Sequence, residues 1–253
     1  MADGDTIGIG RPVRVCIDPG HGGRDNGAYG NGVVEKQVNL DVSLALQGAL
    51  VAAGHEVRMT RTTDTYVGLT ARGCFSVKND CDLFVSVHHD WLSDAGRRGC
   101  SSFVRYESYL NGFDLGSNIT RALNDEWQHG FTYGTECQKH WVNLGVLRGC
   151  NNDGLVTATV VECGCLTNPE DAANAKRDDY AERTASAILT GINGHLGIDG
   201  VEPPQGAEQG PLMVVDHETG LVVWPPENET WVVVENGNHI DDEDQTKVYA
   251  RKA

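Results

Sequence analysis

The chain alternates between short β-type runs and helix-type segments from Val13 to Leu196, and this alternation is the feature that most limits its fold. The β-type runs are bounded by Asp, Gly or Asn, as strands usually are. They are VRVCI, HEVRMT, DLFVSVH, CSSFVRY, GVLRG and TATVVE. Between them, apolar residues recur at helical spacing after Glu35, in LTARGCFSVKND, in NGFDLGSNITRALNDEW and in DDYAERTASAILTGINGHL. This order predicts an α/β protein with a mostly parallel sheet and helices on both faces.

The composition changes around Gly197, which indicates a domain boundary. GIDGVEPPQGAEQGP has the Pro, Gly and acidic content of a linker, and three short β-type runs and a polar tail follow it. We therefore predict a main domain over residues 1–197, a linker over 198–211 and a small β-rich C-terminal segment with a polar tail over 212–253. Because three short strands bury little surface, we expect this segment to pack on the main domain or to mediate self-association.

The charge balance and the cysteines exclude several classes of function. The chain has 36 acidic and 20 basic residues, a net charge of −16, so no basic face for nucleic acid is expected. No apolar run reaches the roughly 18 residues that a membrane span needs. The opening residues MADGDTIGIGRP lack the features of a signal peptide, so we expect synthesis in the cytoplasm. The eight cysteines include no C-x-x-C pair, which argues against a four-cysteine zinc site, and we expect them to be mostly reduced.

Three predicted strands lead into a residue that can bind a metal ion or move a proton. The first runs into the loop of His21, the third ends on His88, and the last ends on Glu162, while Glu35 opens the first helix. The carboxyl ends of parallel strands share one edge of a sheet, where ligands bind. Two imidazoles and one carboxylate form a recurring ligand set for catalytic zinc, and a second carboxylate can move protons. The spacing does not decide which glutamate takes which role.

Each of these residues also has an ordinary structural interpretation. His21 could be a plain loop residue, although its glycine neighbours leave room for an ion or a substrate. Glu35 could be an acid favoured by the helix dipole, and His88 a satisfied core histidine. Glu162 is the hardest to explain structurally, because an acid directly after VTATVV must be paired, protonated or functional. A phosphate-binding loop is disfavoured, since neither Gly-Lys-Ser/Thr nor a dinucleotide pattern is present.

Four blocks of sequence together carry a resemblance to a known family. In chain order they are IDPGHGGRDNGAYGNGVVEK, MTRTTDTYVGLTARG, DLFVSVH and VVECGCLTNPED. They resemble the zinc-dependent N-acetylmuramoyl-L-alanine amidases of the third type, which occur as bacterial cell-wall enzymes and phage endolysins. The resemblance spans about residues 13–196.

The resemblance implies a twisted, largely parallel sheet and a Zn²⁺ ion held by His21, Glu35 and His88. It implies that Glu162 is the catalytic carboxylate. The implied substrate is peptidoglycan, cut at the amide bond between N-acetylmuramic acid and L-alanine. Zinc would polarise the amide carbonyl and lower the pKa of a bound water, and Glu162 would carry the proton to the departing nitrogen.

The chain departs from the family pattern at several positions. After the second histidine the family usually has a small residue and then Asn, whereas this chain has His89 and Asp90. His89 should face the opposite side of its strand from His88, so we assign His88 as the ligand. Cys165 replaces a bulky apolar residue. Two further residues, His140 and Asn151, lie in predicted loops that could reach the substrate.

Some members of the resembled family carry an inserted helix that plugs the site until a partner removes it. A chain without such a helix would be active on its own, which favours a phage-type endolysin that reaches the wall after release through a holin. No inserted helix that would plug the site is recognisable between Tyr106 and Thr157. The alternatives are a host cell-wall remodelling amidase, a zinc hydrolase with another amide substrate, and a non-catalytic wall-binding module of the same fold. The presence of all four candidate site residues argues against the last.

Overall fold

The computed structural model describes residues 12–105, 109–128, 144–150 and 156–198, together with four short strands nearer the C-terminus. In chain order the elements are β1 (Arg14–Pro19), β2 (Tyr29–Gly30), β3 (Val33–Val34), α1 (Glu35–Ala52), β4 (Glu56–Met59), α2 (Leu69–Lys78), β5 (Leu83–Asp90), β6 (Ser101–Phe103), α3 (Tyr109–Trp127), α4 (Gly145–Arg148), β7 (Thr157–Cys165), α5 (Pro169–Ala175), α6 (Tyr180–Leu196), β8 (Val214–Val215), β9 (Val222–Val223), β10 (Trp231–Val233) and β11 (Ala250–Lys252). None of the described helices is long and apolar enough to cross a membrane.

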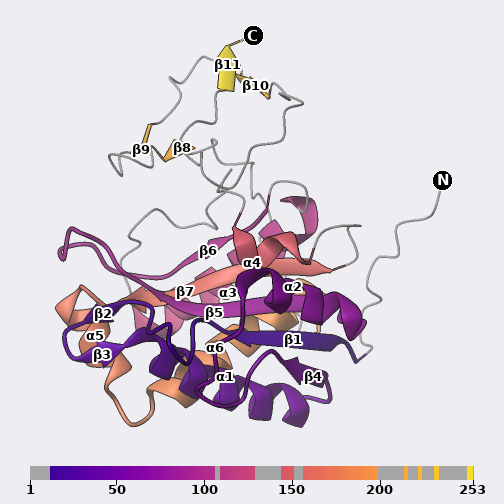
Figure 1. The fold of residues 1–253 in the computed structure, drawn as a ribbon, viewed down its shortest axis with the longest axis horizontal. Coiled ribbons are helices and arrows are strands. Elements are labelled where there is room, and N and C mark those ends of the chain that lie inside the picture. The colour runs from indigo at the N-terminus through magenta and orange to yellow at the C-terminus, as the bar shows by residue number, and fades with distance from the viewer. Residues whose placement is uncertain are drawn as a thin grey trace.

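The central sheet has five strands in the order β4-β1-β5-β7-β6 (Figure 1). The pairings of β1 with β4, β1 with β5, and β5 with β7 are parallel, and only β6 runs antiparallel to its neighbour β7. The predicted α/β architecture with a mostly parallel sheet is therefore confirmed. Because β1, β5 and β7 are adjacent and parallel, their carboxyl ends meet at one edge of the sheet.

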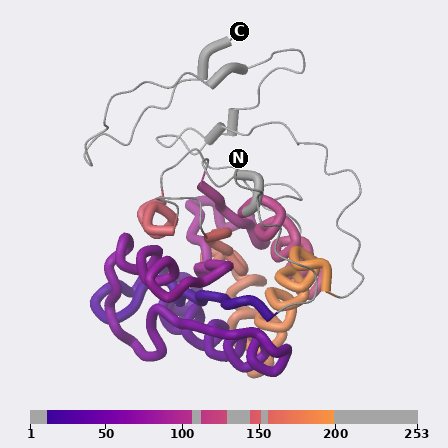
Figure 2. The backbone as a smooth tube through the Cα atoms, turned by 90° about the vertical axis from the view of Figure 1, so that its right-hand side faces the viewer, coloured from indigo at the N-terminus to yellow at the C-terminus, as the bar shows by residue number. Residues whose placement is uncertain are grey.

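The two faces of the sheet carry separate apolar cores, because successive side chains of a strand point to opposite faces. On one face, Val85 and Val87 of β5 belong to a buried cluster with residues of α1, α3 and α6. On the other face, Phe84 packs in a cluster with Cys16 of β1 and Leu147 of α4. Helices therefore cover both faces, as predicted, and Figures 1 and 2 show them on the two sides of the strands.

Helix α1 shows how the sequence pattern sets an element and places a site residue. Its residues Val38, Val42, Leu46 and Leu50 are buried at a spacing of four, which forms one apolar stripe against the sheet. The helix begins at Glu35, directly after strand β3. An acid in the first turn is favoured by the helix dipole, so the ordinary interpretation of Glu35 holds alongside the functional one.

The prediction of a strand for GVLRG is wrong, since this segment forms helix α4. Short apolar runs fit a strand or a buried helical turn equally well, so only the packing decides. Here the decisive contact is between α4 and α2. A side chain at Gly73 of α2 or at Gly149 after α4 would collide with backbone atoms of the other segment, so the two glycines let the helices touch.

Two elements near the site were not predicted. The β2–β3 hairpin is only two residues long on each side. Helix α5 had a readable start signal, because Asn168 caps it by accepting hydrogen bonds from the N–H groups of Glu170 and Asp171, and Pro169 follows at the first helical position.

The C-terminal segment contains two antiparallel pairs, β8 with β9 and β10 with β11. Strands β8 and β9 lie in the first two of the three β-type runs that were predicted after the linker. Strand β11, however, comes from the stretch expected to be a polar tail. Residues 199–213 lie outside the described residues, so the linker and the domain boundaries stay predictions.

Candidate metal centre

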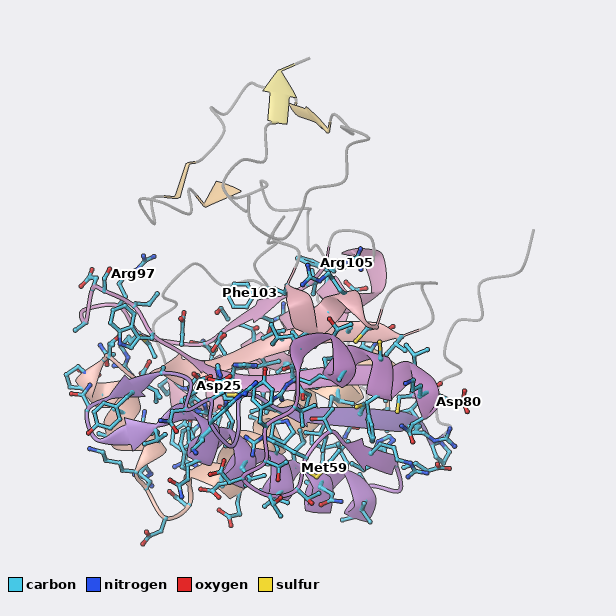
Figure 3. All side chains as sticks on the ribbon, viewed as in Figure 1. Asp25, Met59, Asp80, Arg97, Phe103 and Arg105 are labelled. Carbon is cyan, nitrogen blue, oxygen red and sulfur yellow. The ribbon has the colours of Figure 1, made fainter. Side chains whose placement is uncertain are left out.

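The four candidate residues come together at the carboxyl edge of the sheet. His21 follows β1, His88 lies near the end of β5, and Glu162 of β7 is the register partner of His88. Glu35 is brought to the same edge as the first residue of α1. Figure 3 marks both edges: Asp80 precedes β5 at the amino edge, and Asp25 lies in the loop after β1 at the other.

Glu35 lies between the two imidazoles. Its Oε2 is 3.0 Å from Nε2 of His21, and its Oε1 is 2.9 Å from Nδ1 of His88. The two rings are nearly perpendicular, with centroids 4.9 Å apart. The candidate ligand atoms of the three residues all lie within 4.8 Å of one another. Two imidazoles and a carboxylate converging from three elements fit a catalytic zinc ion, which needs three protein ligands and one open position.

The Glu35 carboxylate is charged and firmly held. Its oxygens accept hydrogen bonds from the N–H of Ala28 (2.7 Å), the side-chain amide of Asn39 (3.2 Å) and the N–H of His89 (3.2 Å). Burial alone would raise the pKa of Glu35, but hydrogen bonds from His21 and His88 outweigh it and hold the pKa well below its usual value. A carboxylate kept ionised in a buried position is suited to bind a cation.

His21 is fixed from its other side by Asp25, which was not among the predicted site residues. Asp25 Oδ2 lies 2.9 Å from Nδ1 of His21. Burial lowers the pKa of His21, but Glu35 and Asp25 together raise it above its usual value. A carboxylate on the second nitrogen of a metal-binding imidazole fixes the ring orientation and increases its basicity. The sequence did offer a signal for this role, because Asp25 is the acidic residue of the block GHGGRDNG that also contains His21.

The glycines of the loop provide clearance for the cluster. A side chain at Gly27 would collide with Glu35 Oε2 and the ring of His21, and one at Gly20 would collide with the ring of His88. His21 itself has a φ of 59°, in the left-handed region that residues other than glycine seldom adopt. The surrounding structure must therefore hold the loop in place.

Two buried arginines hold this loop through its carbonyl groups. Arg72 of α2 donates to the carbonyl of His21 at 2.6 Å and forms an ion pair with Asp18 at 2.8 Å. Arg61 donates to the carbonyl of Gly20 at 2.8 Å. Each guanidinium offers five N–H donors in a fixed plane, so it can satisfy several backbone acceptors at once. The loop of His21 is thereby fastened to both α2 and the segment after β4.

The Asp18–Arg72 pair gives a stability prediction. Asp18 is fully buried and also accepts a hydrogen bond from Ser86 Oγ at 2.7 Å. Asp18→Asn leaves the Arg72 charge buried without a counter-ion, which costs about 3–5 kcal/mol. With a urea m-value of about 2 kcal/mol/M, the unfolding midpoint should fall by roughly 2 M, as measured by circular dichroism.

The control for this variant is Glu56→Gln, which removes an exposed ion pair with Arg14. Exposed pairs contribute about 0–1 kcal/mol, so its midpoint should stay close to that of the unchanged protein. An Asp18→Asn midpoint equal to that of Glu56→Gln would contradict the importance of the buried pair.

Glu162 lies beside the cluster without belonging to it. Its side chain is partly exposed, yet its Oε2 atom is buried and has no hydrogen-bond partner among the described residues. Burial, with the nearby carboxylates of Asp90 and Glu35, raises the pKa of Glu162 well above its usual value. A carboxyl group with a raised pKa and an unused oxygen is suited to accept and donate protons near neutral pH.

His89 and Asp90, the two departures from the family pattern, occupy different surroundings. His89 is buried on the opposite face of β5 from His88, as predicted, where its ring nitrogens bond Asn39 (2.8 Å) and the Tyr180 hydroxyl (2.7 Å). Asp90 lies near the cluster, and its burial, reinforced by the charge of Glu35, raises its pKa to about 6. His89 therefore fastens β5 to α1 and α6.

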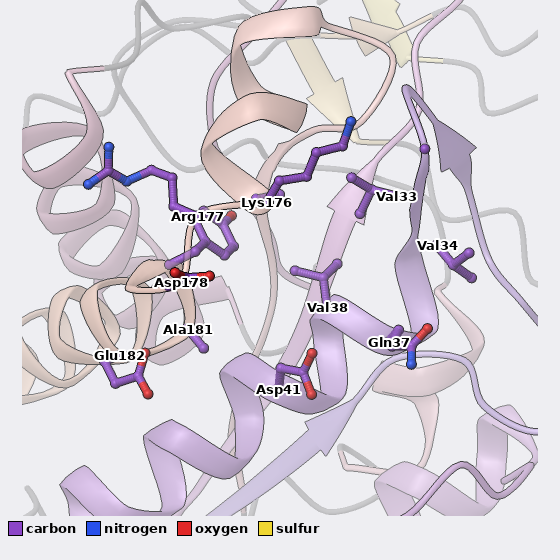
Figure 4. A pocket seen from close by; sticks show the side chains of 13 residues that line it. Val33, Val34, Gln37, Val38, Asp41, Lys176, Arg177, Asp178, Ala181 and Glu182 are labelled. Carbon is purple, nitrogen blue, oxygen red and sulfur yellow. The ribbon is translucent and has the colours of Figure 1, made fainter.

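Other predicted or apparent sites lie elsewhere. His140 and Asn151 fall outside the described residues, so their assignment as substrate contacts stays a prediction. A pocket of about 390 Å³ lies between the start of α1 and the α5–α6 connection, lined by residues such as Val38, Lys176 and Tyr180 (Figure 4). None of the four candidate residues lines it. The convergence of titratable groups, rather than this hollow, marks the site.

The fold and the cluster together define a class of protein. It is an α/β protein that gathers two imidazoles and a carboxylate at the carboxyl edge of a parallel sheet, with a second carboxyl group beside them. This residue set is suited to metal-assisted hydrolysis.

Comparison with known proteins gives the family. The family model described as N-acetylmuramoyl-L-alanine amidase matches residues 15–194. The amidase AmiA of Salmonella typhimurium is 41% identical over 223 residues, covering 70% of this chain and 74% of that protein. The germination-specific amidase of Bacillus subtilis is 25% identical, with 76% and 82% covered. An N-acetylmuramoyl-L-alanine amidase structure from Clostridium difficile 630 superimposes with a TM-score of 0.65 at 26% identity, covering 75% of this chain and 99% of that one.

The chain belongs to the N-acetylmuramoyl-L-alanine amidase family, and its enzyme class is that of a peptidoglycan amidase.

Proposed function

We propose that this amidase is zinc-dependent, with His21, Glu35 and His88 as the metal ligands and Glu162 as the catalytic acid and base. The observation that supports this best is the pair of Glu35 contacts, because both carboxylate oxygens face an imidazole nitrogen. The substrate bond would be the amide between N-acetylmuramic acid and L-alanine. When bound, zinc would polarise the amide carbonyl and lower the pKa of a water molecule toward about 7.

The protein groups divide the remaining work. Asp25 holds the His21 ring, and the N–H groups around Glu35 hold its carboxylate, so contacts within the protein orient the proposed ligands. Glu162 has an unused oxygen beside this set, with which it takes a proton from the attacking water. It then passes that proton to the departing alanine nitrogen, which leaves as an amine.

Metal removal tests the proposal. Protein treated with a chelator should release no L-alanine amino groups from peptidoglycan, and Zn²⁺ should restore the release. At a zinc concentration of 100 times the dissociation constant, binding adds about 2.7 kcal/mol of stability, so the melting temperature should rise by roughly 5–10 °C. Full hydrolysis in metal-free protein would refute zinc dependence, and new amines at another position would refute the proposed bond.

Two biological settings fit this chemistry. The named relatives are cell-wall amidases of bacteria, which favours remodelling of a cell's own wall. Lysis of a host by a phage-type endolysin, released from the cytoplasm, is the other candidate. An endolysin needs no protein activator. The assay above therefore separates the two settings when it is run on intact walls with zinc as the only addition. Rapid loss of turbidity supports lysis, and no loss of turbidity without an activator supports remodelling.

A further inference from the structure

A cation of the loop that carries His21 stacks on an aromatic ring of the segment after β4. Arg24 is exposed and lies three residues after His21, and its guanidinium carbon is 4.3 Å from the ring centroid of Tyr66. The Tyr66 side chain is 45% exposed. Stacking on an aromatic face holds a guanidinium in place while leaving the N–H groups at its edge available.

The two loops that carry this pair are in close contact. A side chain at Gly23 would lie 2.7 Å from the backbone nitrogen of Tyr66, and one at Gly22 would collide with the carbonyl of Thr65. The N–H of Gly23 also donates to Asp64 at 2.7 Å. The position of Arg24 over Tyr66 is therefore set by backbone packing as well as by the ring.

Arg24 has no acidic partner in the described part of the chain, although acids lie close by. The Asp25 carboxylate is occupied by His21 and by the N–H of Gly27 (3.1 Å). The Asp64 carboxylate is occupied by Gly23 and by the Lys36 ammonium (2.8 Å). In a chain with a net charge of −16, a guanidinium that is held on a ring without an acidic partner among the described residues is available to an anion from outside.

We propose that Arg24, held by Tyr66, is a binding subsite for a carboxylate of the peptidoglycan stem peptide, on the residue that follows L-alanine. This inference rests on the proposed function, since it takes the amide at the cluster as the bond that is cut. That carboxylate lies two residues from the scissile carbonyl, about 7 Å along an extended chain, and position 24 lies at most about 11 Å along the backbone from His21. The two distances are compatible.

The test compares two N-acetylmuramoyl peptides that differ only in this group, one with the carboxylate and one with the carboxamide. The unchanged protein should favour the carboxylate by about 10- to 100-fold in kcat/KM, as expected for a charge-assisted pair. Arg24→Gln should reduce that preference to within about 3-fold of unity. Tyr66→Leu should reduce it by about 2- to 5-fold, and Tyr66→Phe should retain it.

Arg58→Gln is the matched control, because Arg58 is exposed on β4 and its guanidinium donates to the neighbouring carbonyl of Val57 at 3.0 Å. It removes the same charge and should keep the full preference. Dissociation constants for both peptides in Glu162→Gln protein give the ratio without turnover, so failure of the amide cleavage does not hide the result. An equal effect of Arg24→Gln on both peptides, or no preference in the unchanged protein, would overturn the subsite.

Discussion

Glu162→Gln should abolish most hydrolysis while leaving the bound zinc in place. A positioned acid–base group typically increases the reaction rate by about 10²–10⁴-fold. Because Glu162 both accepts and returns the proton in the proposed reaction, we expect kcat to fall by about 10³–10⁴-fold. Glutamine keeps the size of the side chain and removes only its ability to transfer a proton. The metal content should stay near that of the unchanged protein, because Glu162 lies outside the set of His21, Glu35 and His88.

The measurement pairs released L-alanine amines with zinc content from elemental analysis. Glu182→Gln, at an exposed position on α6, is a control for loss of one negative charge. Because the unpaired Oε2 of Glu162 is buried, replacing the acid should also preserve or increase stability. Zinc loss in Glu162→Gln would show that this residue is a ligand and that the roles of the two glutamates are exchanged.

Strand order accounts for the part of the site that the sequence predicted. His21 follows β1, and His88 and Glu162 lie in the last part of β5 and β7, although β7 runs on to Cys165 and does not end at Glu162 as predicted. Parallel strands bring their carboxyl ends to one edge. The period of two along β5 also separated His88 from His89 correctly. These inferences needed only local patterns and one rule of sheet geometry.

The residues that support the site could not be predicted in this way, because their roles depend on contacts between distant segments. Arg72 reads as a surface residue in its helical segment, yet it is buried and holds the carbonyl of His21. Nothing local pairs it with Asp18, which is 54 positions away. The helix α4 was predicted wrongly for the same reason, since its close packing on α2 through Gly73 decides its conformation.

The support around the loop bears on metal binding as well as on stability. The backbone of His21 has a φ of 59°, and the carbonyls at Gly20 and His21 are held by Arg61 and Arg72. Strain of this kind persists only where the surroundings over-determine the conformation. Because contacts within the protein hold the loop, zinc binding should need little rearrangement, and the loss of one proposed ligand should lower the metal affinity directly.

His21→Ala should therefore lose both zinc and activity. Removing one of the three proposed ligands leaves His88 and Glu35, which cannot complete the ligand set of a catalytic zinc site. We expect no zinc above background after gel filtration and a loss of hydrolysis at least as large as in Glu162→Gln. Asp25→Asn should have a graded effect, because Asp25 touches only the second nitrogen of His21, and such partners typically contribute 10- to 100-fold in metal affinity.

His55→Ala separates the ligand role from the general cost of removing a histidine. His55 is buried just before β4, at the amino edge of the sheet, and it accepts a hydrogen bond from the N–H of Val13 at 3.4 Å. That variant should lose some stability but keep its zinc, whereas His21→Ala should lose zinc even at temperatures where it is fully folded. Activity in folded, metal-free His21→Ala protein would contradict the ligand assignment. The reaction would then need neither the zinc ion nor the imidazole that is proposed to hold it.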